Sequence, residues 1–202
     1  MADNRNPWLP EPEAIEDETT ELHPEDELQP MKGPDAPQPD TVKLPDSEWL
    51  LPTVNYTQSA PLWWLGAHGG AGETMLAALE PDWPAAEHCW PVSPSETNKV
   101  VLVARTSLQG LTAAQKVVEQ WASGDVSGVD VLGLVFIADS PGRPPKALRD
   151  LAYVIGGGVP RTWLIPWVEA WRVDPPTIET APRAARKLLK DLSVITDGTP
   201  SK

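Results

Sequence analysis

The sequence has little of several features on which extracellular and membrane proteins depend. It holds one cysteine, Cys89, among 202 residues. A single cysteine excludes an internal disulfide and a cysteine-based metal cluster, and it is typical of a reducing compartment. No apolar run approaches the roughly 20 residues needed to span a bilayer, and no basic stretch followed by an apolar one opens the chain. We therefore expect a cytoplasmic protein with no membrane span.

Basic residues are scarce in the first 60 positions, where acidic residues and proline accumulate. Residues 1–60 hold 14 of the 29 acidic residues but three of the 16 basic ones, so the net charge of −13 divides into −11 for this stretch and −2 for the rest. Ten of the 24 prolines also lie there. Such a segment buries too little apolar surface to offset the entropy lost on ordering its backbone. We predict a disordered acidic, proline-rich tail over 1–60, a folded domain over 61–196 and a flexible C-terminus over 197–202.

The acidic tail bears on the choice of partners. Its charge repels nucleic acid and anionic membranes, which argues against direct nucleic-acid binding. It serves either as a solvated spacer or as a docking segment for a protein partner. Docking is supported by Trp8, Trp49 and the pair Leu50-Leu51, because large apolar side chains in a polar segment are common anchors for folding on binding.

Beyond residue 60, short apolar runs alternate with segments of helical periodicity. The runs at 100–104 and 131–138 have no polar alternation, which is typical of strands covered on both faces of a parallel sheet. The expected strands are 61–66, 100–104, 131–138 and 161–165, and the expected helices are 73–79, 107–121, 146–155 and 180–192. This alternation predicts an α/β fold with a doubly wound, mostly parallel sheet, in which ligands lie at the carboxyl ends of the strands. Residues 81–99, rich in proline and serine, are expected to form a long loop.

The most informative stretch is the glycine-rich sequence GAHGGAGET at 66–74. It lies between the first expected strand and the first expected helix, where backbone N–H groups and the positive end of a helix can converge on a phosphate. Gly66, Gly69, Gly70 and Gly72 leave room for the backbone to approach an anion closely. The sequence therefore predicts a phosphate-type loop.

At these residues the chain resembles the deviant-Walker-A ATPases of the ParA/MinD type, whose loop reads K-G-G-x-G-K-[ST]. In this alignment His68 takes the place of the signature lysine, Glu73 that of the phosphate-binding lysine, and Thr74 that of the hydroxyl ligand of Mg²⁺. The resemblance spans about 62–192, since VVLVA with its Ser-Leu helix start, VLGLVFIAD and the pair Ile165-Pro166 follow in the family's order. It implies a P-loop NTPase-like domain of SIMIBI-type architecture.

Both lysines of the family loop are absent. The phosphate-binding lysine of the family cradles the β and γ phosphates and neutralises their charge. An acid at residue 73 instead sets a like charge against the anion. We therefore expect a catalytically degenerate pseudo-NTPase that requires no cofactor and acts as a protein-interaction or regulatory module. The alternative is a working ATPase or GTPase switch that binds Mg-ATP or Mg-GTP, with Arg143 or a partner's lysine replacing the lost charge. In a third interpretation Glu73 caps its own helix and no nucleotide binds.

Hydrolysis also needs a carboxylate on a neighbouring strand to hold magnesium. Asp139, in the sequence Asp-Ser-Pro-Gly after the run 131–138, resembles the Walker B corner of the family. The same run equally fits the later strand that precedes the base-contacting loop, as Gly133 and the downstream Ile165-Pro166 indicate. The second placement is favoured. It leaves no Walker B acid, and the strand that would carry one is then missing from 81–99.

Other reactive side chains have weaker support as site residues. His68, His88 and Cys89 give poor ligand geometry for a metal, because two of them are neighbours on one loop. Several serines lack the context of an activated nucleophile, namely Ser93, Ser95 and Ser107.

Two groups of surface residues leave alternatives open. Trp167 and Trp171 beside Arg172 serve either in packing or as an interface for a protein partner. The basic residues after Asp139 either solvate a helix or bind an anion; they are Arg143, Lys146 and Arg149. The basic face of the last helix is too small to argue for nucleic acid against a pI near 4.5, and pairing with the acidic tail is another use for it. The resemblance implies a homodimer joined across the loop, a contact that His68 in the lysine's place leaves open.

Overall fold

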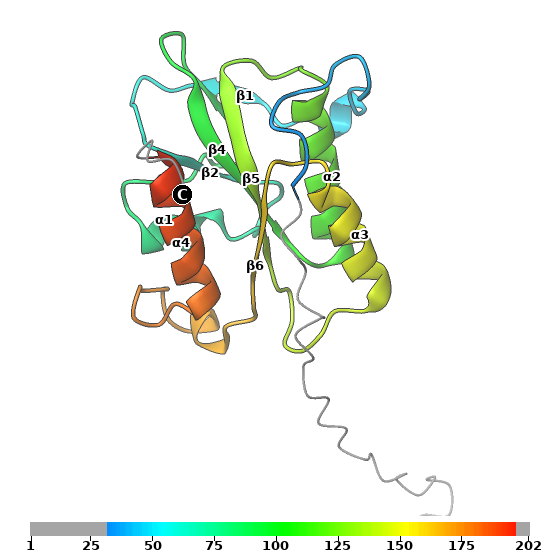
Figure 1. The fold of residues 1–202 in the computed structure, drawn as a ribbon. Helices are drawn as coiled ribbons and strands as arrows, with labels where there is room; N and C mark the ends of the chain where they lie inside the picture. The colour runs from blue at the N-terminus through cyan, green and yellow to red at the C-terminus, as the bar shows by residue number, and fades with distance from the viewer. Residues whose placement is uncertain (1–31, 197–202) are drawn as a thin grey trace, which may run out of the picture.

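A computed structural model describes residues 32–196 of the chain. Its centre is a parallel sheet of four strands in the order β2-β4-β5-β6 (Figure 1). The strands are β2 (Trp63–Gly66), β4 (Asn98–Arg105), β5 (Val129–Ile137) and β6 (Thr162–Ile165). Each falls where an apolar run predicts it, so the expected α/β fold with a parallel sheet is confirmed.

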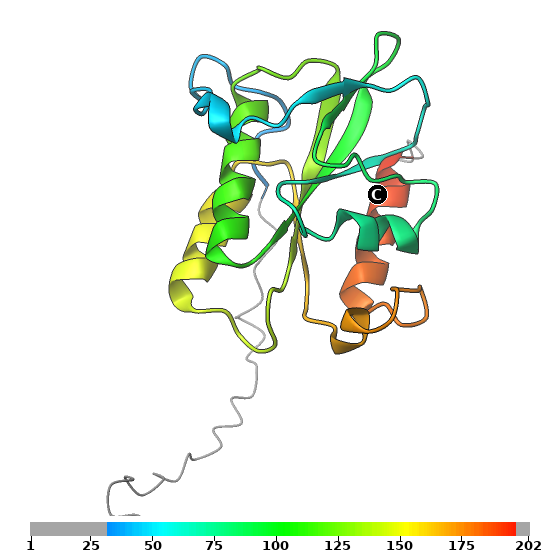
Figure 2. The ribbon, with the colours of Figure 1, turned by 180° about the vertical axis from the view of Figure 1, so that it is seen from behind.

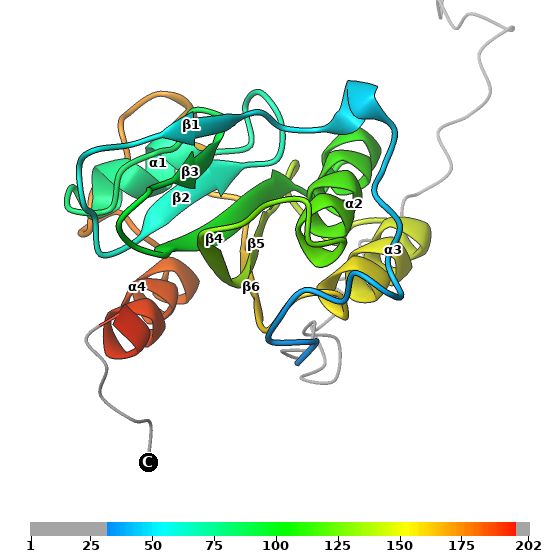
Figure 3. The same ribbon diagram turned by 90° about the horizontal axis from the view of Figure 1, so that it is seen from above.

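Four helices cover the two faces of this sheet. They are α1 (Glu73–Leu79), α2 (Leu108–Ala122), α3 (Lys146–Gly156) and α4 (Arg183–Thr196). Seen from above, α2 and α3 lie on one side of the sheet, and α1 and α4 lie on the other (Figure 3). The arrangement is compatible with a Rossmann-like fold.

The central strands are apolar throughout because both of their faces are covered. Along β4, Val100, Leu102 and Ala104 join the apolar cluster under α2 and α3, whereas Val101 and Val103 join the cluster under α1 and α4. All five side chains are fully buried. Side chains alternate between the two faces of a strand. A strand without polar residues is therefore fully buried only when helices cover both faces of its sheet.

The connections that follow β2 and β4 lead to opposite edges of the sheet. After β2 and α1, Ala85 pairs in parallel with Trp64 on the outer side of β2. After β4 and α2, the chain enters β5 on the other side of β4. Where connections diverge in this way, a crevice forms between the carboxyl ends of two adjacent strands. In this fold the crevice lies between the loop after β2 and the turn after β4.

The segment 32–60 differs from the expected disordered tail. It contains a short 3-10 helix, η2 (Ser47–Trp49), and a strand, β1 (Thr53–Asn55), that pairs in parallel with β3 (Trp90–Val92). It runs along α2 and past α3 (Figure 2). The N–H of Gly33 donates to the carbonyl of Val159 over 2.8 Å, and that of Gln38 donates to the carbonyl of Ala122 over 2.7 Å. We call residues 32–60 the N-terminal arm.

Gln120 ties the N-terminal arm to the core. Its side chain is 2% exposed. Its Oε1 accepts from the indole N–H of Trp90 over 2.9 Å and from the backbone N–H of Leu51 over 3.0 Å. Its Nε2 donates to the carbonyl of Leu51 and to Asp125. The composition of the N-terminal arm predicts disorder, because composition carries no information on contacts with residues so distant in the sequence.

The remaining expectations for the chain ends and loops fall in two groups. Within the expected loop 81–99, the structure places β3 and the Ala85 bridge. Trp8, residues 1–31 and the predicted flexible end 197–202 lie outside the described residues. Over residues 32–196, every helix is too short or too polar to cross a membrane.

Candidate functional site

The glycine-rich loop leaves β2 at Gly66 and enters α1 at Glu73. Two of its glycines have positive φ, Gly70 at 77° and Gly72 at 106°. A Cβ on Gly72 would lie 2.7 Å from Cδ1 of Ile137, so the loop passes directly over the end of β5. The backbone conformation therefore favours glycine at residue 72, and a larger residue would also displace the end of the Ile137 side chain.

Glu73 closes the loop from its inner side. The carboxyl group is 4% exposed and accepts a hydrogen bond from the backbone N–H of Gly66. Nδ1 of His88 lies 3.3 Å from the other carboxylate oxygen. Burial raises the pKa of Glu73 above its ordinary value, although the N–H groups of Gly66 and His88 and the imidazole oppose this shift. Glu73 makes no cap hydrogen bond to the N-terminus of α1, which differs from the third interpretation of the sequence.

His88 is held against Glu73 by an unusual backbone. Glu87 and His88 have φ of 52° and 60°, in the left-handed region that costs a residue with a side chain roughly 1 kcal/mol or more. Nδ1 of His88 also lies 3.0 Å from the carbonyl of Gly66. Because its neighbours are a carbonyl and a carboxylate, Nδ1 carries the proton and donates. A Cβ on Gly66 would come within 3 Å of Glu73 and His88, which explains that glycine.

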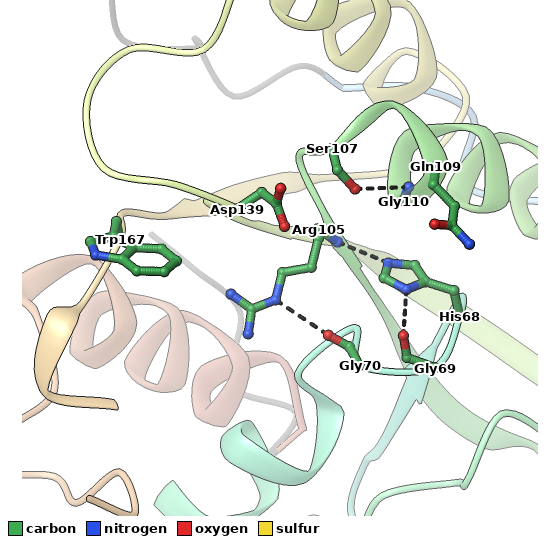
Figure 4. A pocket seen from close by; sticks show the side chains of 9 residues that line it. All are labelled: His68, Gly69, Gly70, Arg105, Ser107, Gln109, Gly110, Asp139 and Trp167. Atoms are coloured by element: carbon green, nitrogen blue, oxygen red, sulfur yellow. Dashed lines mark hydrogen bonds between the residues drawn. The ribbon is translucent and has the colours of Figure 1, made fainter. Parts of the chain in front are cut away.

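A cavity of about 380 Å³ occupies the crevice on the outer side of the loop (Figure 4). It lies where the strand connections diverge. Its lining comes from the glycine-rich loop, the turn after β4, the start of α2 and the ends of β5 and β6: His68, Gly69, Gly70, Arg105, Ser107, Gln109, Gly110, Asp139 and Trp167. Both the position and the size suit a small ligand.

Arg105 is the basic residue at this cavity. Its guanidinium donates to the carbonyl of Gly70 from Nε over 3.3 Å and to the carbonyl of Ala138 from Nη1 over 3.1 Å. Its Nη2 lies 3.5 Å from the sulfur of Met75. Burial lowers the pKa of Arg105, and the charge of Asp139 partly opposes that shift. Over residues 32–196, Arg105 forms no ion pair.

His68 joins the loop to the end of β4. Its Nε2 accepts from the backbone N–H of Arg105 over 3.2 Å, so Nδ1 carries the proton and donates to the carbonyl of Gly69 over 2.9 Å. The start of α2 comes so close that a Cβ on Gly110 would lie 2.9 Å from Nε2 of His68 and 2.4 Å from the carbonyl of Arg105. The imidazole therefore has a structural task in its neutral form.

The start of α2 forms the wall of the cavity opposite the loop. Ser107 is the N-cap residue of α2, and its hydroxyl oxygen accepts from the N–H of Gly110 over 3.2 Å. The hydroxyl proton remains free to donate. The amides of Leu108 and Gln109 precede the first intrahelical hydrogen bond, so both point their N–H groups out of the helix end.

The structure divides the predicted site residues between two places. His68, Gly69, Gly70 and Asp139 line the cavity, whereas Gly66 and Glu73 lie behind the loop. Thr74 is exposed on α1 and does not line the cavity. Arg143 also lies outside the lining, and Arg105 contacts the loop instead. Asp139 follows β5, which is separated from β2 by β4 and so is not its neighbour.

The other candidates form no second site. Within the part of the chain that the structure describes, no group of three His, Cys, Asp or Glu side chains could hold a metal ion. Ser93 and Ser95 bond to each other in an exposed turn. Trp171 packs against the core cluster of α4, while Trp167 lines the cavity with the guanidinium of Arg172 5.8 Å from its ring centre.

Sequence reasoning did not assign five of the cavity residues to the site: Arg105, Ser107, Gln109, Gly110 and Trp167. A signal for Arg105 is present in the sequence, because it directly follows the apolar run 100–104, and parallel strands end at the same edge of a sheet. Trp167 likewise follows the last strand. Gly110 carries no such signal, since glycine in a helix is usually read only as a weakness.

Comparison with known proteins identifies the family of the chain but assigns no function to it. A family model described as a family of unknown function (DUF6668) matches residues 60–189, more than half of the chain, and the chain belongs to this family. No curated protein and no solved structure matches the chain.

Proposed function

We propose that this member of the DUF6668 family is a catalytically degenerate relative of the ParA/MinD-type ATPases, acting as a protein-interaction or regulatory module. The observation that carries the proposal is the buried carboxyl group of Glu73, bonded to the N–H of Gly66. The alignment gives this residue the place of the phosphate-binding lysine. Instead of a cation that attracts phosphate, the loop holds an acid that uses a backbone donor internally.

The fold supports the same relationship. A strand leads through a glycine-rich loop into a helix in a parallel sheet with helices on both faces, which suits a P-loop domain of SIMIBI-type architecture. The residue that ends the neighbouring strand β4 is Arg105, where a magnesium-binding acid would be expected. Asp139 follows β5, which is one strand further from the loop than β4.

Surfaces outside the loop support an interaction role. Trp49 is 43% exposed on the N-terminal arm, and Trp167 and Arg172 stack beside the cavity. Exposed tryptophan and arginine are enriched among the residues that dominate binding energy at protein interfaces. We infer a protein partner that contacts these residues or the acidic segment that precedes the arm. We infer that the protein makes no direct contact with nucleic acid. A homodimer joined through the loop would have to use His68 in a different way from the signature lysine.

Hydrolysis and calorimetry with Mg-ATP and Mg-GTP test the proposal. We expect the natural protein to release no phosphate above background and to bind neither nucleotide with micromolar affinity. Glu73→Lys is the informative variant, with Glu80→Lys at the other end of α1 as its matched control. Nucleotide binding gained only in Glu73→Lys would indicate an intact loop disabled by its acid. Hydrolysis by the natural protein that Thr74→Ala abolishes would contradict the proposal.

One observation favours the alternative, a nucleotide-binding switch with a substituted charge. Nε of Arg105 lies 3.3 Å from the carbonyl of Gly70, so a basic side chain does reach the loop. If the natural protein binds Mg-ATP or Mg-GTP tightly and Arg105→Gln abolishes that binding, the switch is the better description.

A further inference from the structure

Arg105 carries a positive charge that makes no ion pair within residues 32–196, although the charge of Asp139 acts on it from beyond ion-pair distance. Its three contacts are two carbonyl oxygens and a thioether sulfur, all of them neutral. Over residues 32–196 no carboxylate lies within ion-pair distance of it. The side chain is half-buried, so water compensates its charge only in part, as the lowered pKa of Arg105 also indicates.

The space beside this guanidinium is built to admit a ligand. The cavity measures about 380 Å³ and is ringed by side chains from separate elements, with Arg105 near the loop and Trp167 after β6 (Figure 4). Gly69 and Gly70 have no atom within 4 Å of the position that a Cβ would take. The backbone of these two glycines is therefore uncovered in the direction in which a Cβ would point.

Several hydrogen-bond donors face the same cavity. Ser107 accepts through its oxygen from the N–H of Gly110, which leaves its hydroxyl proton for a ligand. The first amides of α2, a helix of 15 residues, add N–H groups and the positive end of the helix dipole. Together with the guanidinium, these donors favour an oxyanion.

The remaining walls restrict which oxyanion fits. Asp139 is an exposed carboxylate on the rim, so a second anionic group near it would be repelled, whereas a ligand hydroxyl could donate to it. Trp167 supplies an aromatic surface, with the guanidinium of Arg172 5.8 Å from its ring centre and Glu169 accepting from its indole N–H. The ligand class with one oxyanion attached to a hydroxylated or aromatic body is a small phosphate monoester.

We propose that the cavity between the glycine-rich loop and the start of α2 binds a small organic phosphate, with its phosphate group against Arg105 and Ser107. This deepens the proposed function, on which it rests, because it names a small ligand to which a regulatory module that does not hydrolyse nucleotide can respond. The phosphate position is distinct from the inner side of the loop, where the carboxyl group of Glu73 lies.

Binding is measured on the full chain by ¹⁵N NMR titration with inorganic phosphate and with phenyl phosphate. We expect shifts at the amides of Gly69, Gly70, Leu108 and Gln109, and at the indole N–H of Trp167 with phenyl phosphate alone. Phenyl phosphate should bind more tightly than inorganic phosphate. Shifts confined to the basic residues of α4, or equal affinity for the two probes, would overturn the proposal.

Three variants separate the cavity from general charge. Arg105→Gln should weaken phosphate binding by roughly tenfold or more, as expected for loss of a charge-assisted contact. Arg161→Gln, an exposed arginine at the other end of β6, should leave it unchanged. Because Arg105→Gln also removes contacts within the fold, Asp139→Asn provides a second test, and it should tighten binding by roughly threefold. Unchanged affinity in Asp139→Asn, or equal weakening by the two arginine variants, would refute the site.

These outcomes are distinguishable from failure of the proposed function. Hydrolysis of Mg-ATP or Mg-GTP contradicts the proposed function, whether or not the phosphate probes bind at Arg105. A protein that neither hydrolyses nucleotide nor shows shifts around the cavity with either probe refutes the phosphate site and leaves the proposed function standing.

Discussion

The backbone N–H of Arg105 donates to Nε2 of His68, and this hydrogen bond of 3.2 Å holds the glycine-rich loop against the end of the neighbouring strand. The contact joins residues that are 37 positions apart. It means that the residue aligned with the signature lysine works here as an acceptor, a role that a lysine cannot take. The loop is therefore fixed to the sheet by a side chain of different chemistry.

His68→Ala should loosen the loop without unfolding the domain. The N–H of Arg105 loses its acceptor, which corresponds to a cost of roughly 1 kcal/mol. Hydrogen exchange of that amide, followed by NMR, should become about fivefold faster. Thr112→Ala, an exposed change on α2, serves as the control. Unchanged exchange at Arg105 would show that the hydrogen bond contributes nothing to the position of the loop.

Glu73→Gln should change how stability depends on pH. Because burial raises the pKa of Glu73 above 4.5, the folded state holds this proton more tightly than the unfolded chain does. The associated stability is fully present below about pH 4.5 and is lost as the pH rises through the folded pKa. The variant keeps an uncharged side chain, so its advantage over the natural protein should grow with pH across this window.

Urea denaturation from about pH 4 to about pH 7 measures this difference. Glu80→Gln, just beyond the end of α1, is the control for a charge removed outside the loop. If Glu73→Gln loses stability relative to the natural protein as the pH rises, the carboxylate is stabilised by Gly66 and His88 more than burial penalises it.

Gly110→Ala should destabilise the domain, although alanine is normally the better residue inside a helix. The added Cβ would lie 2.4 Å from the carbonyl of Arg105, where only a shift of backbone can relieve it. We expect a loss of roughly 1–3 kcal/mol in the free energy of unfolding. Gly69→Ala, with nothing near its Cβ, should fall within about 0.5 kcal/mol of the natural protein.

Glu87→Gly should be neutral or stabilising. Glu87 is exposed and has a φ of 52°, so glycine removes a strain of roughly 1 kcal/mol that opposes its usual entropic cost. Thermal unfolding provides the measurement. A loss comparable to that of glycine at an ordinary exposed position, about 1 kcal/mol, would show that the left-handed backbone is not strained.

Gln120→Ala should be among the more damaging substitutions outside the apolar core. It leaves the indole N–H of Trp90 and the backbone of Leu51 without partners in a buried setting. The expected loss is about 2–4 kcal/mol, with a red shift of tryptophan fluorescence as Trp90 gains water. Gln115 lies earlier on α2, and its side chain donates to Glu119. Gln115→Ala should therefore cost less than about 1 kcal/mol.

The sequence predicts those elements whose cause is local. The runs 100–104 and 131–138 are recognisable as buried strands because each is apolar at every position, and the glycines at 66–72 mark the loop. The N-terminal arm escapes prediction because its stability comes from Gln120 and Val159, which composition cannot connect to it. The sequence likewise offers Arg143, in the turn after β5, as a source of positive charge, whereas in the structure Arg105 at the end of β4 contacts the loop.

The N-terminal arm also fixes an order of events during synthesis. The amide of Gly33 finds its acceptor at Val159, 126 positions later, and that of Gln38 finds its acceptor at Ala122. At about 5–20 residues per second, the ribosome delivers Val159 roughly 6–25 s after Gly33. Over that interval the first part of the arm to be made lacks its native contacts, and it closes over a sheet that must already be nearly complete.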